Sequence, residues 1–231
     1  MTKQLGIVGG IGPETTILYY RYISDFFRSS GHKQPNIFIN SIDASEMLSY
    51  VESGDLEGLC KLMVHQLERL SRSGVDFAIM ASNTPHIVFD EVQASSPIPL
   101  ISIVSVTVER ASQLGLRKPC ILGTKSTMVG DFYPYEFSKK GIEIALPPSN
   151  KVELFHDRYM NELMCGVYKE TTKREFMDEI NAIKDNFNID SIILGGTELS
   201  FLLKDEDFDE ITVLDSTYIH LNEIVEVLKS E

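Results

Sequence analysis

The chain has 231 residues, of which 43% are hydrophobic and 24% charged, a composition typical of a globular protein with a substantial core. Its 21 lysines and arginines are outnumbered by 34 acidic residues, giving a net charge of −13 at pH 7. This balance argues against a nucleic-acid partner, because such affinity depends largely on basic side chains that neutralise phosphates. No apolar run reaches the ~20 residues that a membrane-spanning helix needs, so we also expect no membrane partner.

Short apolar runs alternate with longer stretches of helical period along the whole chain. In chain order, we predict strands at residues 5–8, 36–40, 77–80, 100–101, 120–123, 142–145, 191–194 and 211–214. We predict helices at residues 15–29, 56–73, 104–114, 128–139, 151–167, 172–186 and 218–229. This alternation predicts an α/β fold in which parallel sheets are covered by helices.

The N-terminus and the cysteines bear on the cellular compartment. The first residues lead directly into an apolar strand, from which we expect no signal peptide. The three cysteines, Cys60, Cys120 and Cys165, are odd in number and lack metal-like spacing, so we expect no metal site. A reducing, cytoplasmic location is the natural expectation.

Internal similarity favours two domains over a single barrel. The segment GIVGGIGPETT near the start resembles CILGTKSTMVG at 120–130, and AIMASNTPHI at 78–87 resembles IILGGTELSF at 192–201. In each half the two motifs are about 70 residues apart. We therefore predict two pseudo-symmetric domains, each a four-stranded parallel sheet flanked by helices, with an active-site cleft between them. Prolines 97 and 99 and the acidic loop at 204–210 predict an N-terminal domain of residues 1–97 plus 208–231 and a second domain of residues 98–207.

Small and hydroxyl-bearing residues follow four of the predicted strands. In open parallel sheets, ligands gather at the carboxyl ends of the strands, and helix N-termini there bind carboxylates. We therefore expect a small anionic ligand. The glycine-rich loop at 9–13 matches neither the dinucleotide fingerprint nor a P-loop. The predicted substrate-binding residues are Gly10, Asn83, Thr84, Thr124, Ser126, Thr127 and Thr197.

Five segments, GIVGGIGPETT, ASNTPH, LGTKSTM, LGGTELS and LDSTYIH, resemble in order and spacing the signature segments of the aspartate/glutamate racemase family. The resemblance implies a homodimer that binds an acidic amino acid and racemises it with no cofactor, neither pyridoxal phosphate nor metal. Family members use two cysteines, one on each face of the α-carbon. The matching positions in this chain are Ser82 and Gly196.

These two substitutions decide which chemistry is possible. Serine is a far weaker acid than cysteine and needs a neighbouring base, and glycine has no side chain, so the two-thiol mechanism cannot operate. The candidate catalytic residues are Ser82, His86, Glu198 and the vacated position Gly196. Alternatively, His86 anchors its loop and Glu198 orients its own. Glycine at position 196 is expected to leave open space on one face of the substrate.

Three functions follow from the resemblance and the missing thiols. The first is an isomerase-like enzyme that binds an acidic amino acid or related carboxylate and transfers the α-proton without a cofactor. The second is a non-catalytic binding or regulatory homologue. The third is a lyase or a different isomerase on the same scaffold. The loss of both cysteines leaves all three open.

Overall fold

The computed structural model describes residues 3–230, so the first two residues and the last residue of the predicted N-terminal domain lie outside the described part. The chain divides into two compact units. The first comprises Met1–Ile103 and His220–Glu231, and the second comprises Val104–Ile219. Within residues 3–230, no helix combines the length and apolar character needed to cross a bilayer.

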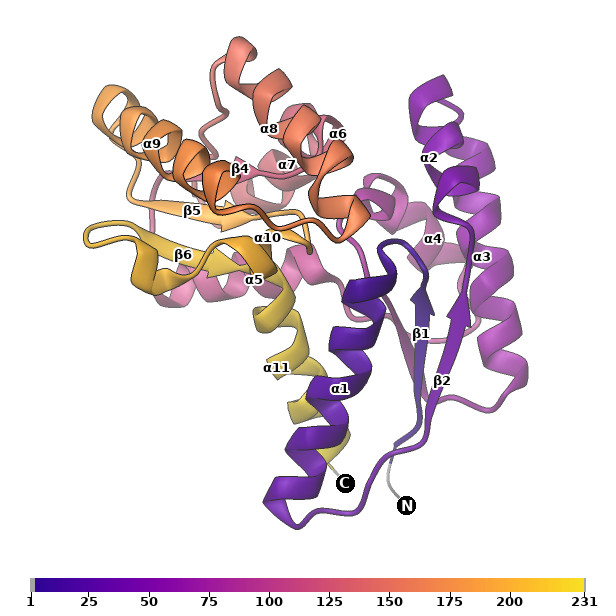
Figure 1. The fold of residues 1–231 in the computed structure, drawn as a ribbon. Helices are drawn as coiled ribbons and strands as arrows, with labels where there is room; N and C mark the ends of the chain where they lie inside the picture. The colour runs from indigo at the N-terminus through magenta and orange to yellow at the C-terminus, as the bar shows by residue number, and fades with distance from the viewer. Residues whose placement is uncertain (1–2, 231) are drawn as a thin grey trace. The chain divides into compact units, whose positions relative to one another are not determined.

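The first unit is built on a parallel sheet with the strand order β2-β1-β3 (Figure 1). Its strands are β1 (Leu5–Gly9), β2 (Ile37–Ser41) and β3 (Phe77–Met80). Successive side chains of a strand point to opposite faces, and Ile7 and Val8 are both fully buried, so helices cover both faces.

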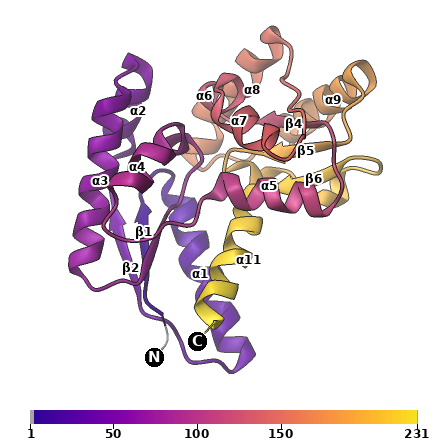
Figure 2. The same cartoon turned by 180° about the vertical axis from the view of Figure 1, so that it is seen from behind.

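One face of this sheet is covered by α3 (Leu56–Arg72), accompanied by α2 (Ala44–Ser53) and α4 (Phe89–Ser95). The stripe that α3 buries is Leu59, Met63, Leu67 and Leu70. In both views, α1 (Pro13–Ser30) lies beside the C-terminal helix α11 (Ser216–Lys229) (Figures 1 and 2). A buried hydrogen bond of 2.8 Å between Tyr19 Oη and His220 Nδ1 joins these two helices.

The second unit has a parallel sheet with the order β4-β5-β6. Its strands are β4 (Pro119–Leu122), β5 (Ser191–Leu194) and β6 (Thr212–Asp215). Helices α8 (Ser149–Asn161) and α9 (Glu170–Phe187) cover one face, and α5 (Ile103–Gln113) lies on the opposite face (Figures 1 and 2). Phe155 of α8 and Phe176 of α9 meet edge to face, with ring centroids 4.8 Å apart.

The structure contains several short elements beyond the predicted helices. The predicted helix at 128–139 is two helices, α6 (Lys125–Val129) and α7 (Phe132–Ser138), because Gly130 adopts an extended conformation. Helix α2 was not predicted; the Asp43 carboxylate caps it by accepting from the Ser45 N–H at 2.8 Å. The other short elements are η1 (Thr84–Val88), η2 (Leu163–Cys165), α10 (Leu199–Leu202) and η3 (Asp205–Asp207).

The prediction of an α/β fold with helix-flanked parallel sheets is confirmed, but the prediction of four strands in each sheet is wrong. Each sheet has three strands, and a single bridge takes the fourth position. In the first unit Leu100 bridges to Ala78; Pro99 has no N–H to donate, and α5 begins at Ile103. In the second unit Ala145 bridges to Cys120, and the strand cannot extend because Pro147 and Pro148 follow almost at once.

With these bridges included, the two sheets have the same order. The first sheet runs β2-β1-β3-Leu100, and the second runs Ala145-β4-β5-β6. Both orders are 2-1-3-4 when the strand positions of each half are numbered along the chain. The four-position repeat expected from the sequence is therefore present, but a different position is shortened in each copy.

The predicted domain boundaries need correction, because the last strand belongs to the second unit. Strand β6 pairs with β5, with Ile193 opposite Leu214, and so completes the second sheet. Residues 208–219 therefore lie in the second unit, and residues 98–103 in the first. The chain returns to the first unit within α11, at His220, and not in the acidic loop.

Candidate functional site

In the first unit, the loop after β1 requires glycine for steric reasons. Gly10 has φ +85°, a conformation that side chains rarely adopt, and its N–H donates to Thr16 Oγ1 at 2.9 Å. A Cβ atom at Gly10 would lie 2.6 Å from Ser41 Oγ, at the end of β2. This close approach explains the glycine by packing alone, so its role in substrate binding stays a prediction.

The loop after β3 carries the predicted residues Ser82, Asn83 and Thr84, all buried. It lies beside the β1 loop because the two strands are neighbours and the Ala81 N–H donates to the Val8 carbonyl at 2.9 Å. The structure thus places the Gly10 loop and the Ser82 loop at the same edge of the first sheet.

His86 does not form a catalytic pair with Ser82 in this structure. Its side chain is 3% exposed and stacks on Phe89, with ring centroids 5.1 Å apart. Among the residues described, neither ring nitrogen has a hydrogen-bond partner. Burial lowers the pKa of His86 from 6.5 to about 4, although the nearby carbonyls of Ser82 and Asn83 offset part of this effect. Because no hydrogen bond joins the His86 ring to the Ser82 hydroxyl, His86 is not placed to act as the base that would activate Ser82.

In the second unit, six predicted residues lie in two adjacent loops. Thr124 caps α6, and its Oγ1 lies 2.9 Å from Ser126 Oγ and 3.0 Å from Thr127 Oγ1. The loop after β5 is adjacent, since the Gly195 N–H donates to the Leu122 carbonyl at 2.7 Å. That loop carries Gly196, Thr197 and Glu198.

The helices after three of these four loops are short. Elements η1 and α6 have five residues each and α10 has four, whereas α1 has 18. A helix dipole is the sum of aligned peptide dipoles, so a single turn contributes little to carboxylate binding. The helix-terminus argument therefore applies only to α1, where Pro13 lacks one N–H donor.

Helix α8 packs against the Thr124 loop. The Lys125 N–H donates to His156 Nδ1 at 3.1 Å, and Lys125 Nζ lies 2.5 Å from Glu153 Oε1. Both partners are on α8. The Lys125 charge is thereby paired within its own unit.

Helix α8 also reaches the vacated cysteine position, which is not open space. A Cβ atom on Gly196 would lie 2.8 Å from Cζ and 2.9 Å from Oη of Tyr159, and closer still to Cε2. Tyr159 is 4% exposed and fills the volume that a side chain at position 196 would need. The expectation of an opening beside the substrate is therefore wrong. Sequence reasoning missed Tyr159; the only signal was the glycine itself, since close-packed interiors refill a lost side-chain volume.

The Glu198 carboxylate is hydrogen-bonded to Tyr159. The Tyr159 hydroxyl and Thr197 Oγ1 both donate to Glu198 Oε2, the second at 3.0 Å. Glu198 is only 1% exposed. Burial, and then the charge of Glu198, raise the pKa of Tyr159 well above its usual value, so the phenol keeps its proton at neutral pH.

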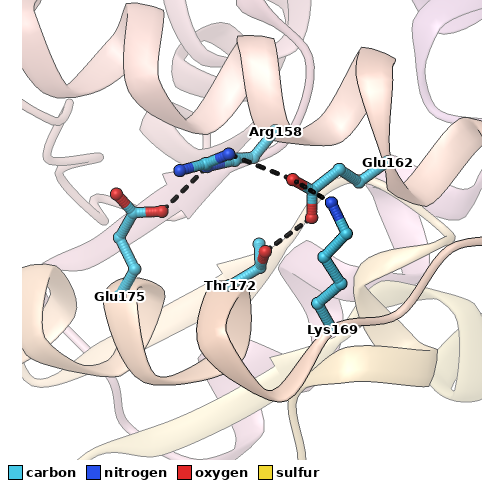
Figure 3. Close-up of polar contacts among 5 residues, drawn as sticks. All are labelled: Arg158, Glu162, Lys169, Thr172 and Glu175. Atoms are coloured by element: carbon cyan, nitrogen blue, oxygen red, sulfur yellow. Dashed lines mark hydrogen bonds and ion pairs between the residues drawn. The ribbon is translucent and has the colours of Figure 1, made fainter.

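A polar network of five residues joins α8 and the residue that follows it to α9 (Figure 3). Arg158 donates to Glu175 Oε2 at 2.8 Å and to Glu162 Oε1 at 3.0 Å. The buried Glu162 carboxylate also accepts from Thr172 Oγ1 at 2.5 Å and pairs with Lys169 at 3.1 Å. The Thr172 hydroxyl is the main cause that lowers the pKa of Glu162.

Thr172→Val is expected to lower the free energy of unfolding by about 1.5–3 kcal/mol at pH 7, because it removes a buried hydrogen bond to a carboxylate at nearly constant volume. The loss should shrink on acidification, since a carboxyl with a lowered pKa loses its stabilising effect as it protonates. Urea unfolding at pH 7 and at lower pH measures both effects. Thr171→Val, at the exposed neighbouring threonine of α9, is the matched control; equal losses in the two variants would contradict the prediction.

The cysteines lie outside these loops. Cys120 is buried in β4, and burial raises its pKa to about 12, so it remains a thiol. Cys60 lies in α3 and Cys165 in η2. In the part of the chain that the structure describes, no group of three metal-ligating side chains comes together.

Comparison with known proteins finds similarity to amino-acid racemases, in both sequence and structure. Residues 8–224 match the family model described as Asp/Glu/Hydantoin racemase. The chain is 33% identical to an aspartate racemase homologue from Pyrococcus horikoshii OT3, with 100% of each chain covered and a TM-score of 0.83. It is 29% identical to a putative Asp/Glu racemase from Yersinia pestis, covering 98% of this chain and 99% of that one, with a TM-score of 0.87.

A curated relative matches over a shorter stretch. The broad specificity amino-acid racemase RacX of Bacillus subtilis is 24% identical over 149 residues, which is 61% of this chain. The match spans 63% of the length of that relative.

Proposed function

The chain belongs to the Asp/Glu/hydantoin racemase family, and on this premise we propose that it binds a small acidic amino acid or a related carboxylate. The ligand contacts come from the loops after β1, β3, β4 and β5. Any proton transfer at the α-carbon is independent of pyridoxal phosphate and metal and uses the Ser82 face. The family resemblance also supports a homodimer in the cytoplasm.

One observation favours binding over racemisation: the Tyr159 ring occupies the space next to Gly196, where the family has its second thiol. Racemisation needs a proton acceptor on one face of the α-carbon and a donor on the other. Within residues 3–230, the nitrogens of His86 make no hydrogen bond that would activate Ser82, and Gly196 has no side chain. The function supported best is therefore carboxylate binding without interconversion of enantiomers, in agreement with the binding or regulatory alternative.

Proton NMR in deuterated water tests this proposal with L- and D-aspartate and L- and D-glutamate. We expect the protein to broaden the ligand resonances, while chiral chromatography of the same samples shows no second enantiomer. Absence of broadening for all four amino acids would contradict the proposed binding. Appearance of the opposite enantiomer would contradict the proposed lack of racemisation.

Ser82→Ala locates the ligand in the same experiment. Loss of one hydrogen bond to the ligand is expected to weaken binding about fivefold. Ser138→Ala is the matched control, because the Ser138 hydroxyl bonds only locally, to the Tyr135 carbonyl of α7. Equal affinities of the two variants would exclude Ser82 from the ligand site.

A further inference from the structure

Tyr159 holds the position at which the family carries its second cysteine, and this suggests a defined role for it. We propose that Tyr159 replaces that cysteine: its ring fills the side-chain volume at position 196, and its hydroxyl donates to Glu198. Chemistry at the α-carbon is then confined to the Ser82 face. This inference rests on the proposed function and adds Tyr159 as a positioning residue.

The backbone does not explain why residue 196 is glycine. Gly196 is absent from the glycines with positive φ, so its backbone would accept an ordinary side chain. What excludes a side chain is the Tyr159 ring, because the atoms Cζ and Oη lie 2.8 and 2.9 Å from an ideal Cβ. Ordinary contacts of a Cβ atom begin at about 3.4 Å. Glycine at 196 and tyrosine at 159 are therefore two parts of one packing arrangement.

The hydroxyl of Tyr159 is as constrained as its ring. It donates to Glu198, whose buried carboxylate requires donors to offset its desolvation. Because burial and the Glu198 charge raise the pKa of the phenol, the proton stays on Tyr159 near neutral pH. A group that holds its proton in this way serves as a fixed hydrogen-bond donor and does not exchange protons with an α-carbon.

Helix α8 is anchored on both sides of the ring. Before Tyr159 in the helix, Glu153 pairs with Lys125 at 2.5 Å. Directly before and shortly after it, Arg158 and Glu162 join the network with α9 (Figure 3). These contacts oppose a shift of the helix that would carry the ring away from position 196.

The test introduces a cysteine at position 196, either beside an aromatic ring at position 159 or beside a smaller side chain that leaves room for the thiol. Gly196→Cys is combined with native Tyr159, with Tyr159→Phe or with Tyr159→Leu, in a background carrying Cys60→Ser and Cys165→Ser. Phenylalanine keeps Cε2 and Cζ, the two ring atoms closest to the new side chain, whereas leucine lacks both. Thermal unfolding and the rate of alkylation by iodoacetamide, located by mass spectrometry, are measured without any ligand.

With native Tyr159 or with Tyr159→Phe, we expect Gly196→Cys to lower Tm by several degrees and the new thiol to react slowly. With Tyr159→Leu, the added cysteine should cause little further loss in Tm, and its thiol should react at least tenfold faster. The inference is overturned if Gly196→Cys alone leaves Tm unchanged and reacts as fast as in the Tyr159→Leu background. Because no ligand is present, this outcome is distinct from failure of the proposed ligand binding.

A second measurement follows activity. Adding Ser82→Cys supplies the other thiol, and chiral chromatography monitors L-aspartate and L-glutamate. Racemisation that appears with Ser82→Cys, Gly196→Cys and Tyr159→Leu together, but not with the two cysteine substitutions alone, supports the inference. Equal racemisation with and without Tyr159→Leu contradicts it.

Discussion

Phe176→Ala is expected to lower the free energy of unfolding of the second unit by about 3–5 kcal/mol. Phe176 is fully buried on α9 and packs edge to face against Phe155 of α8. Truncation removes the transfer free energy of the ring and leaves a cavity between the two helices. Because α9 supports α8, the variant should also loosen the helix that places Tyr159 beside Gly196.

Urea unfolding followed by circular dichroism measures this loss. Phe187→Ala is the matched control on the same helix, since Phe187 is 41% exposed and its truncation leaves no cavity. We expect the control to change the free energy of unfolding by less than about 1 kcal/mol. Similar losses for the two variants would contradict the packing of α8 on α9 described above.

Acidification from pH 7 to pH 5 is expected to destabilise the first unit strongly, because its two buried histidines are neutral in the folded state. Burial lowers the pKa of His86 from 6.5 to about 4. Burial and the neighbouring His86 lower the pKa of His220 to about 3, although its bond to the Ile101 carbonyl acts in the opposite direction. Shifts of this size correspond to about 3 and 5 kcal/mol when complete.

The direction of the effect follows from proton binding. Below about pH 6.5 the unfolded chain protonates both histidines, while the folded chain does not until pH 4 or lower. The unfolded state therefore binds more protons, and stability falls as the pH falls through this window. Each histidine contributes a slope approaching about 1.4 kcal/mol per pH unit.

Urea unfolding at several pH values between 7.5 and 5 measures the slope for the native protein and for His86→Gln. The variant should lose about half of the histidine contribution. His65→Gln is the control, because the His65 side chain is 61% exposed on α3, and it should leave the slope unchanged. An equal slope in all three proteins would show that His86 does not titrate as a buried neutral group.

Most of the architecture could be predicted from the sequence, because it depends on local and periodic signals. Apolar runs and helical stripes gave the parallel sheets and their helices, and the paired motifs gave the duplicated unit. The same motifs placed the loops that carry Ser82, Thr124 and Glu198, and they led to the family that the comparisons support. The absence of both thiols was visible at Ser82 and Gly196 without any structure.

The tertiary structure decided what depends on contacts between distant residues. Strand β6 joined the second sheet through its ladder with β5, which no local pattern specifies. His86 follows Ser82 by four residues, a spacing that allowed a hydrogen-bonded pair. In the structure the His86 ring stacks on Phe89 instead, and its nitrogens have no hydrogen-bond partner among the described residues. Tyr159 and Gly196 meet only because α8 packs on α9 and over the β5 loop. The sequence by itself therefore determined the family, the loops and the missing thiols, whereas close packing between helices and sheet decided what fills the vacated position.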